Sequence, residues 1–435
     1  MEKSLGEKQI AIVGGGIGGL FCAYLLTLKG YSVTLYEAKS AVGLKWLVAG
    51  ASGINCSTTY NLQEFASRYI GARERFLSYL QKWGPTNLCD FFVSLGCSIV
   101  KGSSHKILLA KEPSPKAILE CWLDKIIKTN RFTLKLNHKL SNFSKTQEGF
   151  LLEFENGSRA SSYLLILALG GASYKKTGSD GLWTTMLKSK GLQINDFLPA
   201  NCGFHISYSS YLQGYFSNHR YLKNVALCLD KNYQDCDGKT KIRGDITFTP
   251  FGLEGLPVYQ LGYQIRTLLQ SKNRATLYID LLPDYTIEDI YKKVGKGISS
   301  KKSSAHWLSN KLHLSSLAFT LVKDYLGQSF IDRLRLGSLT KAELSSLKAV
   351  AIEVDGIAPI DKAISVAGGV SLDELDYHLM VKKYPGLFLC GEMLDWEAPT
   401  GGFLMQGVFT MAYILCDGVP RYFNPIKKEG GSTVV

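Results

Sequence analysis

Apolar and polar positions at the start of the chain change from a strand-like run to a helical repeat and back. Residues 9–13 form the short apolar run QIAIV, which is typical of a buried strand. A glycine-rich turn follows, and then the apolar helix pattern IGGLFCAYLLTLKG, whose final Gly30 is suited to end a helix. A second run, YSVTLYE, closes the unit. This order predicts a βαβ unit over residues 9–37.

The next part of the chain combines helices with a small group of strands. Apolar residues recur at a spacing near 3.6 in residues 61–95, and residues 113–130 form another amphipathic pattern, so both stretches are predicted helical. The runs FTLKLNHKL, GFLLEFENG and SSYLLILALGG are predicted strands. An Asn-Gly turn at residues 156–157 indicates an antiparallel meander followed by a buried strand.

The pattern changes again at Phe197. Short strands rich in Tyr, Cys and Gly come first, and residues 256–328 are mostly helical in pattern, which we interpret as an insertion. The last part returns to the buried strand PGLFLCGE, a glycine-rich turn and the helix FLMQGVFTMAYILCDG. If that terminal strand joins the N-terminal sheet, the nucleotide-binding domain is discontinuous in sequence.

The first glycine turn has the spacing of a dinucleotide-binding site, GxGxxG. Its first glycine permits the tight turn, the second lets the backbone approach a pyrophosphate, and the third lets the helix pack closely on the strand. The free amides of the helix start face the phosphates. The acid that closes the second strand can accept hydrogen bonds from ribose hydroxyls, so the unit suits NAD or FAD. The predicted binding residues are Gly14, Gly16, Ile17, Gly18, Gly19 and Glu37.

A second stretch, near the C terminus, favours FAD. The buried strand GLFLCGE ends in a carboxylate that can approach a ribityl hydroxyl or the pyrophosphate. The Thr-Gly-Gly turn after it opens a helix whose amides would face the flavin pyrimidine edge, where reduction places negative charge. The alternative is that this helix only packs in the core. The predicted contacts are Gly391, Glu392, Thr400, Gly401, Gly402 and Phe403.

Charge adds a candidate partner. The formal net charge is +13, which favours contact with polyanions and equally fits a generally soluble basic surface. Residues 290–323 contain seven lysines and no Asp or Glu, with Trp307 and two histidines among them. This fits contact with an RNA backbone, and the alternative is a solvated helix face with a core tryptophan. The lysines predicted for RNA contact are Lys292, Lys293, Lys301 and Lys302.

Cysteine spacing and hydropathy exclude several classes. The ten cysteines include no CxxC pair, and no Cys/His cluster has zinc-ligand spacing, so neither a metal site nor a local redox pair is predicted. Most cysteines lie in apolar runs, which indicates reduced, buried thiols. The N-terminus lacks the apolar core of a signal peptide, and no 18-residue run is both charge-free and strongly apolar. We therefore expect a cytoplasmic chain without membrane contact.

Six stretches together resemble the BaiN/RdsA family of FAD-dependent oxidoreductases, and in particular its YhiN-like flavoprotein branch. They are IAIVGGGIGGL with Glu37, GLKWLVAGASGINCST, LILALGGASYKKTGSDG, GDITFTPFGLEG, ISVAGGVSLDELD and PGLFLCGEMLDWEAPTGGF. The segment GEMLDWEAPTGG is the most specific, because a stretch of that length rarely recurs outside one branch.

The resemblance implies an α/β fold of three parts, in which a β-barrel-like domain and a helical domain are inserted into a Rossmann-like FAD/NAD(P)-binding domain. The expected bounds are 1–196 and 353–425 for the Rossmann-like domain, 197–255 and 329–352 for the β-barrel-like domain, 256–328 for the helical domain, and 426–435 for a flexible tail.

The resemblance also implies four further cofactor residues. Lys45 and Asn55 are expected to line the flavin side, the backbone around Leu140 to lie near adenine, and Gly170 to follow the strand that closes the FAD sheet.

This chain departs from the broad family at two positions where arginine is usual, since it has Leu44 and Ile54. In addition, Ala51 stands where the branch has a lysine. An anionic group that those side chains would contact therefore needs another partner in this chain.

The activities that the resemblance implies are reductions of carbon–carbon double bonds, one on a steroid-type substrate and one on a uridine of large-subunit ribosomal RNA. Such chemistry needs hydride from a reduced flavin and an acid that protonates the neighbouring carbon. The sequence identifies no clear acid, and Tyr174, Lys175, Cys56 and Asp395 are candidates by their proximity to the matched loops.

Three functions follow from these observations. The first is an FAD-dependent reductase of a small molecule or an RNA base, with NADH or NADPH as a candidate transient donor. The second is an RNA- or ribosome-associated protein that keeps FAD without turnover. The third, a dehydrogenase that uses NAD at the first βαβ unit, is disfavoured by the flavin-type C-terminal stretch.

Overall fold

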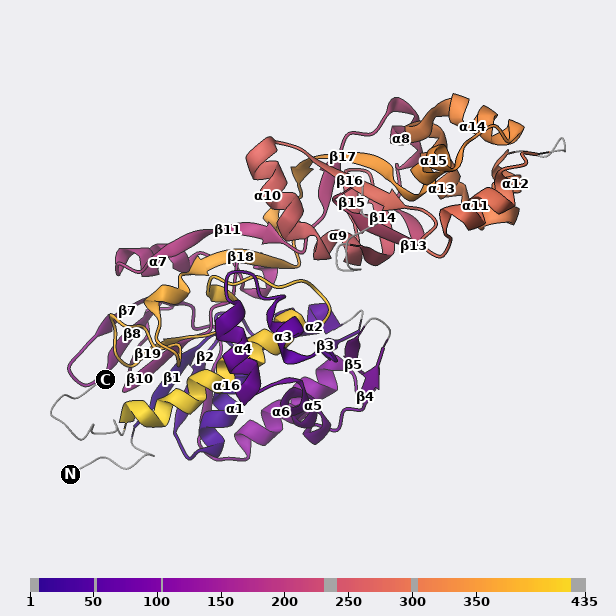
Figure 1. Ribbon diagram of the computed structural model, residues 1–435. Coiled ribbons are helices and arrows are strands. Elements are labelled where there is room, and N and C mark those ends of the chain that lie inside the picture. Colours follow the sequence, from indigo (N-terminus) through magenta and orange to yellow (C-terminus); the bar gives the residue numbers. More distant parts are fainter. Residues whose placement is uncertain (1–7, 51–52, 103–104, 231–240, 299–303, 424–435) are drawn as a thin grey trace, which may run out of the picture. The chain divides into compact units, whose positions relative to one another are not determined.

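The computed structural model describes residues 8–50, 53–102, 105–230, 241–298 and 304–423. These residues form two compact units, one from Met1–Leu198 with Ile364–Val435 and one from Pro199–Ala363 (Figure 1). The chain therefore leaves the first unit, completes the second, and returns.

A five-stranded parallel sheet forms the centre of the first unit. Four of its strands are buried at every residue, as their apolar runs predict. The strand Leu387–Leu389, near the C terminus, pairs with the strand Leu164–Leu167, and Leu165 lies opposite Leu387. Distant parts of the chain therefore share one sheet. In spatial order the strands are β19 (Leu387–Leu389), β10 (Leu164–Leu167), β1 (Ile10–Val13), β2 (Val33–Tyr36) and β6 (Phe132–Lys135).

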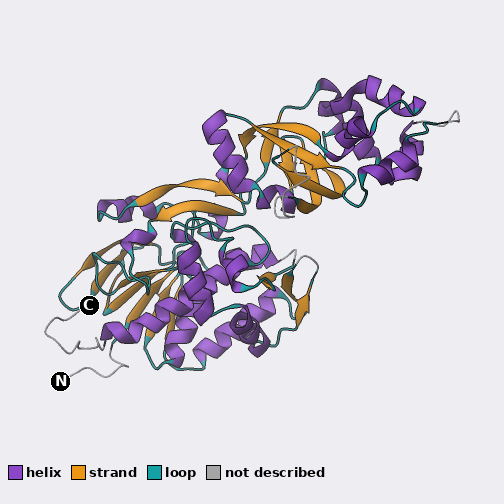
Figure 2. Ribbon diagram, in the orientation of Figure 1, coloured by secondary structure: helices purple, strands orange, loops and turns teal. Residues whose placement is uncertain are grey.

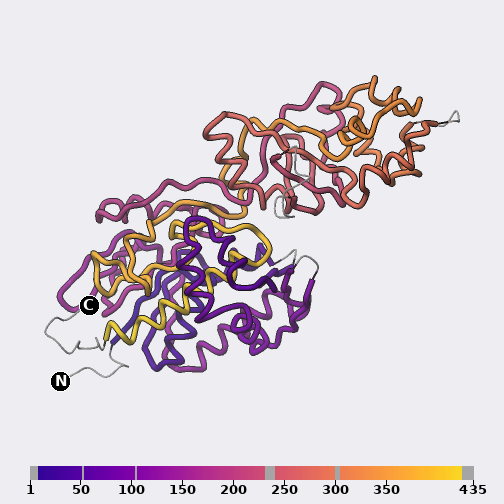
Figure 3. Tube along the Cα trace, in the orientation of Figure 1, coloured from indigo at the N-terminus to yellow at the C-terminus, as the bar shows by residue number. Residues whose placement is uncertain are grey.

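Two helices from opposite parts of the sequence pack together in this unit. They are α1 (Ile17–Leu28) and α16 (Phe403–Phe423), drawn in indigo and yellow in Figure 3. The rings of Phe21 and Phe409 lie 4.8 Å apart, and the Lys29 ammonium donates to the Cys416 carbonyl at 2.8 Å. The discontinuous domain is thus confirmed.

By length and composition alone, α16 is apolar enough to cross a membrane, and it contains Asp417. However, 67% of its most apolar window is buried inside the molecule. Packing in the core therefore accounts for its apolar character.

The stretch at residues 61–95 is helical as predicted, but it forms three helices. Gly71 has φ +74° between the first two helices, and Gly84 precedes Pro85, which begins the third. They are α3 (Leu62–Ala66), α4 (Arg73–Lys82) and α5 (Pro85–Ser94). Beside them lie α2 (Leu44–Gly50) and an antiparallel sheet of β3 (Asn55–Thr58), β5 (Lys106–Leu109) and β4 (Ile99–Lys101).

One strand assignment is corrected. The run FTLK, predicted in the meander, is β6 of the parallel sheet, where Phe132 lies opposite Val33. The reason is that α6 (Pro115–Ile127) precedes it and provides a crossover, which parallel pairing requires. The meander consists of β7 (Leu140–Lys145), β8 (Phe150–Phe154) and β9 (Arg159–Ser162). Later in the chain come α7 (Trp183–Ser189) and β11 (Ile194–Ala200). Strand β11 pairs with β18 (Ser365–Val370), which follows the second unit in sequence.

The second unit contains a closed six-stranded barrel, which confirms the inserted barrel-like domain. Strands and helices are coloured separately in Figure 2. The order around the barrel is β12 (Phe204–Ile206), β15 (Gly252–Glu254), β14 (Ile242–Thr249), β13 (Arg220–Cys228), β16 (Ala275–Asp280) and β17 (Val350–Ile357).

The stretch whose pattern is mostly helical also contains one strand of the barrel, β16. This strand is a run of six residues with alternating burial, and it lies between longer helices. The helices of this unit are α8 (Ser210–Tyr215), α9 (Leu256–Gln260), α10 (Gly262–Lys272), α11 (Ile287–Val294), α12 (Ser304–Leu312), α13 (Ser316–Leu321), α14 (Gly327–Leu336) and α15 (Lys341–Leu344). The three-domain boundaries stay a prediction, and residues 426–435 lie outside the described residues.

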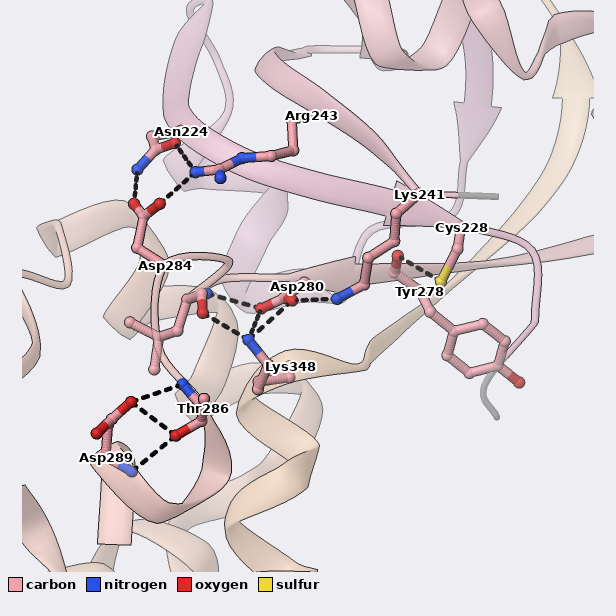
Figure 4. Close-up of polar contacts among 11 residues, drawn as sticks. Asn224, Cys228, Lys241, Arg243, Tyr278, Asp280, Asp284, Thr286, Asp289 and Lys348 are labelled. Atoms are coloured by element: carbon pink, nitrogen blue, oxygen red, sulfur yellow. Dashed lines mark hydrogen bonds and ion pairs between the residues drawn. The ribbon is translucent and has the colours of Figure 1, made fainter. Parts of the chain in front are cut away.

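A buried ion cluster ties three parts of the barrel together (Figure 4). Asp280, 1% exposed at the end of β16, lies 2.7 Å from the Lys241 ammonium and 3.0 Å from that of Lys348. Lys348 also donates to the Leu282 carbonyl at 2.6 Å. Burial lowers the pKa of Lys348, although the nearby Asp280 opposes this effect. The Asp280 carboxylate therefore compensates two ammonium groups where β14 begins and where β16 turns towards β17.

Candidate functional site

The predicted cofactor residues line up along one edge of the parallel sheet. Gly14 follows β1, Glu37 follows β2, Gly170 comes shortly after β10, and Gly391 comes shortly after β19. Because these strands are neighbours and parallel, their carboxyl ends meet at the same edge. Open α/β sheets bind ligands in the crevice at this edge.

Two glycines of the first turn have no room for a side chain, and a third faces open space. A Cβ on Gly14 would lie 2.2 Å from the Ala168 carbonyl oxygen, and one on Gly19 would lie 2.0 Å from the Gly14 carbonyl oxygen. Neither position accepts a side chain. A Cβ on Gly16 would meet nothing within 4 Å, and no side chain caps α1 at this residue. Open space beside the helix start, which includes Ile17 and Gly18, fits a diphosphate.

The Glu37 side chain, at the end of the second strand, is hydrogen-bonded to the glycine turn. Its Oε2 accepts a hydrogen bond from the Gly15 N–H at 2.6 Å, and its Oε1 accepts one from the Lys39 N–H at 2.8 Å. Burial raises the pKa of the carboxyl group, and these backbone bonds partly counteract the rise. Each carboxylate oxygen has further capacity as an acceptor, so ribose hydroxyls can still bind there.

The segment leading to Leu140 is hydrogen-bonded to the backbone of Glu37 and Lys39. The His138 N–H donates to the Glu37 carbonyl at 2.8 Å, and the Asn137 N–H donates to the Lys39 carbonyl at 3.1 Å. Leu140 begins β7 directly afterwards. The structure thus brings together the two positions expected at the adenosine end.

At the other end of the edge, three side chains from distant segments meet. The Lys45 ammonium lies 2.6 Å from Glu392 Oε2 and 3.0 Å from the Ser173 hydroxyl. Lys45 and Glu392 are 31% and 15% exposed. Sequence reasoning had selected Lys45 and Glu392 separately, and had missed Ser173, whose signal was its place in the matched stretch after Gly170. This cluster is suited to bind hydroxyl and phosphate oxygens.

Asn55 and the start of α16 form one wall of the site. A Cβ on Gly402 would lie 2.6 Å from the Ser57 carbonyl oxygen, so glycine lets the helix start touch β3. The buried Gln406 accepts a hydrogen bond from the Ser57 hydroxyl at 2.7 Å, and sequence reasoning had missed both. Thr400, Gly401 and Phe403 flank this contact, and the Phe403 carbonyl accepts from a buried tyrosine at 2.8 Å.

Asn55 carries a further indication of a ligand. Its Oδ1 is buried without a hydrogen-bond donor among the described residues. An unpaired buried acceptor is costly, and a cofactor hydroxyl or ring N–H would satisfy it. Together with the open space at Gly16, this unpaired acceptor means that the residues present fit a dinucleotide cofactor.

Two candidate acids have structural contacts. The hydrogen bond with Cys89, together with burial, raises the pKa of Cys56 far above its usual range, so this thiol stays protonated. The Asp395 oxygens accept from Asn195 at 2.6 Å and from the Gly368 N–H at 3.2 Å.

The other two candidates lie in the loop after β10. Tyr174 is half-buried with φ +61°, a conformation that is uncommon outside glycine, and its ring centroid lies 5.6 Å from the Lys45 ammonium. Lys175 is exposed.

The basic segment is partly described. Lys292 and Lys293 are exposed on α11, whereas Lys301 and Lys302 lie outside the described residues. Trp307 is 8% exposed and packs in the core of the second unit. For this residue the structure agrees with the alternative to RNA contact, which was a solvated helix face with a core tryptophan.

Thiols and metal ligands add no further centre in the parts of the chain that the structure describes. All nine cysteines there are free, and no group of three or more His, Cys, Asp or Glu could hold a metal ion.

Comparisons with known proteins agree with this geometry. The family model described as HI0933-like protein Rossmann domain matches residues 8–417. The chain is 22% identical to the 3-dehydro-bile acid delta(4,6)-reductase of Clostridium scindens, over 94% of this chain and 98% of that protein. It is 25% identical to the ribosomal RNA dihydrouridine synthase of Escherichia coli, over 92% and 95% of the two chains.

Among solved structures, the 3-ketosteroid delta1-dehydrogenase of Sterolibacterium denitrificans shares the fold. The TM-score is 0.50 at 11% identity, over 95% of this chain and 99% of that one. Together with the family match, these relatives confirm the resemblance, the enzyme class and the cofactor predicted from the sequence. The chain therefore belongs to the HI0933-like family, which includes BaiN and RdsA, and is an FAD-dependent oxidoreductase.

Proposed function

We propose that this enzyme reduces a carbon–carbon double bond that is conjugated to a carbonyl group. The observation that carries the proposal is the match to two relatives over more than 90% of every chain involved. Their names describe different substrates, a bile acid and a ribosomal RNA, but the same change, which is saturation of a conjugated double bond. A match of that extent includes both the FAD sheet and the inserted barrel.

When bound and reduced, FAD supplies the hydride for such a reaction. The residues of the chain would hold the cofactor along the sheet edge. Glu37 would accept hydrogen bonds from the ribose hydroxyls, the amides around Gly16 would bind the diphosphate, and Lys45 with Glu392 would contact the ribityl side. The positive end of α16, a helix of 21 residues, favours the negative charge that reduction creates.

For the proton, we propose Tyr174. Cys56 is held protonated and hydrogen-bonded, and Asp395 already accepts two hydrogen bonds, so neither is free to donate. The Tyr174 ring instead lies beside Lys45, at the end of the edge assigned to the flavin. A positioned phenol is an ordinary general acid for such a step.

The substrate is either a small conjugated ketone or a uracil base in RNA. Exposed Lys292 and Lys293 and the net charge of +13 support the RNA base, and the bile-acid reductase supports the small molecule. NADH or NADPH is the proposed transient donor, and we propose a cytoplasmic location without membrane contact. The alternative function is an FAD-containing RNA-associated protein without turnover, which the same two lysines favour.

An anaerobic two-step experiment separates these functions. The FAD-loaded protein is mixed with NADH, NADPH or dithionite, and bleaching is followed near 450 nm, roughly the general flavin maximum. An enone such as 2-cyclohexen-1-one, an unsaturated steroid ketone, or uridine-containing RNA is then added. Recovery of absorbance with a saturated product supports the reductase. If the reduced flavin is not reoxidised by any conjugated acceptor, the proposal fails and the protein without turnover stands.

A further inference from the structure

Exposed aromatic side chains gather at one end of the barrel. Phe251 is 75% exposed at the tip of the turn between β14 and β15, and Tyr211 is 50% exposed in α8. Tyr208 joins these two places, because its hydroxyl donates to the carbonyl oxygens of Thr249 at 2.7 Å and Gly252 at 3.1 Å. Large exposed rings in one place indicate a binding surface rather than ordinary surface variation.

Basic side chains lie against the tyrosines of α8. The Lys323 ammonium is 5.4 Å from the Tyr211 ring centroid, and the Arg220 guanidinium carbon is 5.2 Å from that of Tyr215. Both cations are exposed, so they stay available to an anion while they contact the rings. This end of the barrel therefore presents flat apolar faces and positive charge together.

Acidic residues are scarce in the segments that build this surface. No Asp or Glu stands between Asp196 and Asp230, and none stands in residues 290–323. The contact of Lys323 with Tyr211 joins these two acid-free stretches in space. Two acids lie close by and accept hydrogen bonds from serines of the segment before α8: Asp324 accepts at 2.7 Å from the serine that caps α8, and Asp355 accepts at 2.5 Å from Ser207.

We propose that this surface, formed by Tyr211, Phe251, Arg220 and Lys323 and called here the aromatic corner, binds single-stranded nucleic acid. Cations at the rings neutralise backbone phosphates, and unpaired bases stack on the exposed rings. A duplex offers its phosphates but hides its base faces, so the rings favour a single strand. The inference concerns binding alone and is independent of the proposed reduction and of Lys292 and Lys293.

The test measures binding of the FAD-loaded full chain to a fluorescent oligouridine of about 12 nucleotides, a site size typical of such proteins. The variant Tyr211→Ala with Phe251→Ala is expected to bind roughly a hundredfold more weakly, since each stacked ring contributes on the order of tenfold. Lys323→Gln is expected to reduce the slope of log affinity against log salt by about one. Oligothymidine and a duplex of equal length are the comparison ligands.

A matched control exists in the same unit. Tyr263 on α10 is 40% exposed and has the buried Arg266 guanidinium 5.7 Å from its ring, so Tyr263→Ala removes an exposed ring whose neighbouring cation is buried. Tyr211→Phe keeps the ring and is expected to keep the affinity. Unchanged binding by the double alanine variant, an equal loss in the Tyr263 control, or equal affinity for the duplex would each overturn the proposal. Stronger binding of oligouridine than of oligothymidine would identify RNA as the ligand, and flavin content and Tm verify that each variant is folded.

Discussion

The sheet edge of the first unit and the barrel of the second unit are held in different ways. At the edge, backbone atoms approach so closely that Gly14, Gly19 and Gly402 leave no room for a Cβ. In the barrel, the cluster around Asp280 uses side-chain charges that are buried together. The difference means that one added carbon atom should destabilise the sheet edge, whereas removal of one charge should destabilise the barrel.

The largest effect is expected in the barrel. Asp280→Ala removes the carboxylate that pairs with the largely buried ammonium group of Lys348. Breaking a buried ion pair costs about 3–5 kcal/mol of unfolding free energy. Urea unfolding followed by tryptophan fluorescence measures the loss. Asp284→Ala, which removes an exposed partner of Arg243, is the control and should leave the midpoint unchanged. If both variants unfold alike, the buried cluster is not what holds the barrel.

A slightly smaller loss is expected at the sheet edge. Gly19→Ala forces a methyl group against the Gly14 carbonyl oxygen, and overpacking of this kind costs about 3 kcal/mol. The apo protein should therefore melt at a lower temperature. Calorimetry with and without FAD checks this, and an unaltered Tm in the apo form would contradict the close contact.

Loss of the Tyr174 hydroxyl is expected to act on catalysis alone. Tyr174→Phe should slow reoxidation of the reduced flavin by an enone about a hundredfold, the lower end of the range for general acids. Reduction by the donor and FAD content should stay as in the wild type. Stopped-flow absorbance separates the two half-reactions. Equal slowing of both would assign Tyr174 a structural role.

Gly16→Ala is the counterpart of the Gly19 variant, because its methyl group meets open protein space. The fold should persist while the methyl group occupies the cradle of the diphosphate, so the Kd for FAD should rise about tenfold, or ~1.4 kcal/mol. Quenching of flavin fluorescence reports the affinity. Unchanged affinity together with unchanged Tm would show that the diphosphate lies elsewhere.

The smallest expected effect is a pH dependence from Glu37. Its folded pKa is raised above the unfolded value near 4.5, so its contribution to stability is present below that value and is lost as pH rises through the folded pKa. Glu37→Gln should flatten this part of the apo stability profile. A profile that is identical in both proteins would mean that the carboxyl group is not desolvated.

Local patterns predicted the parts of the site that are continuous in sequence. The spacing of the first glycine turn, the acid after β2 and the strand ending in Gly391 and Glu392 each follow from a few neighbouring residues, and the structure places them on one edge. The contact of Lys45 with Glu392 joins residues 347 positions apart, and a pair of opposite charges gives no signal of its partner in a single sequence.

The missed elements have the same physical origin. Strand β16 lies directly between α10 and α11, so it was grouped with the helical stretch around it, and β6 was grouped with the strands that follow it although α6 makes it parallel. Trp307 shows that a basic segment does not reveal which of its aromatic residues are buried, because burial depends on the neighbouring helices.

The late strand β19 has a consequence for synthesis on the ribosome. About 350 residues separate Glu37 from Leu389, and at roughly 5–20 residues per second a ribosome needs on the order of 20–70 s to add them. During that time the nascent chain exposes a sheet that lacks its last strand and α16. The flavin site should therefore be complete only after β19 and α16 have been synthesised.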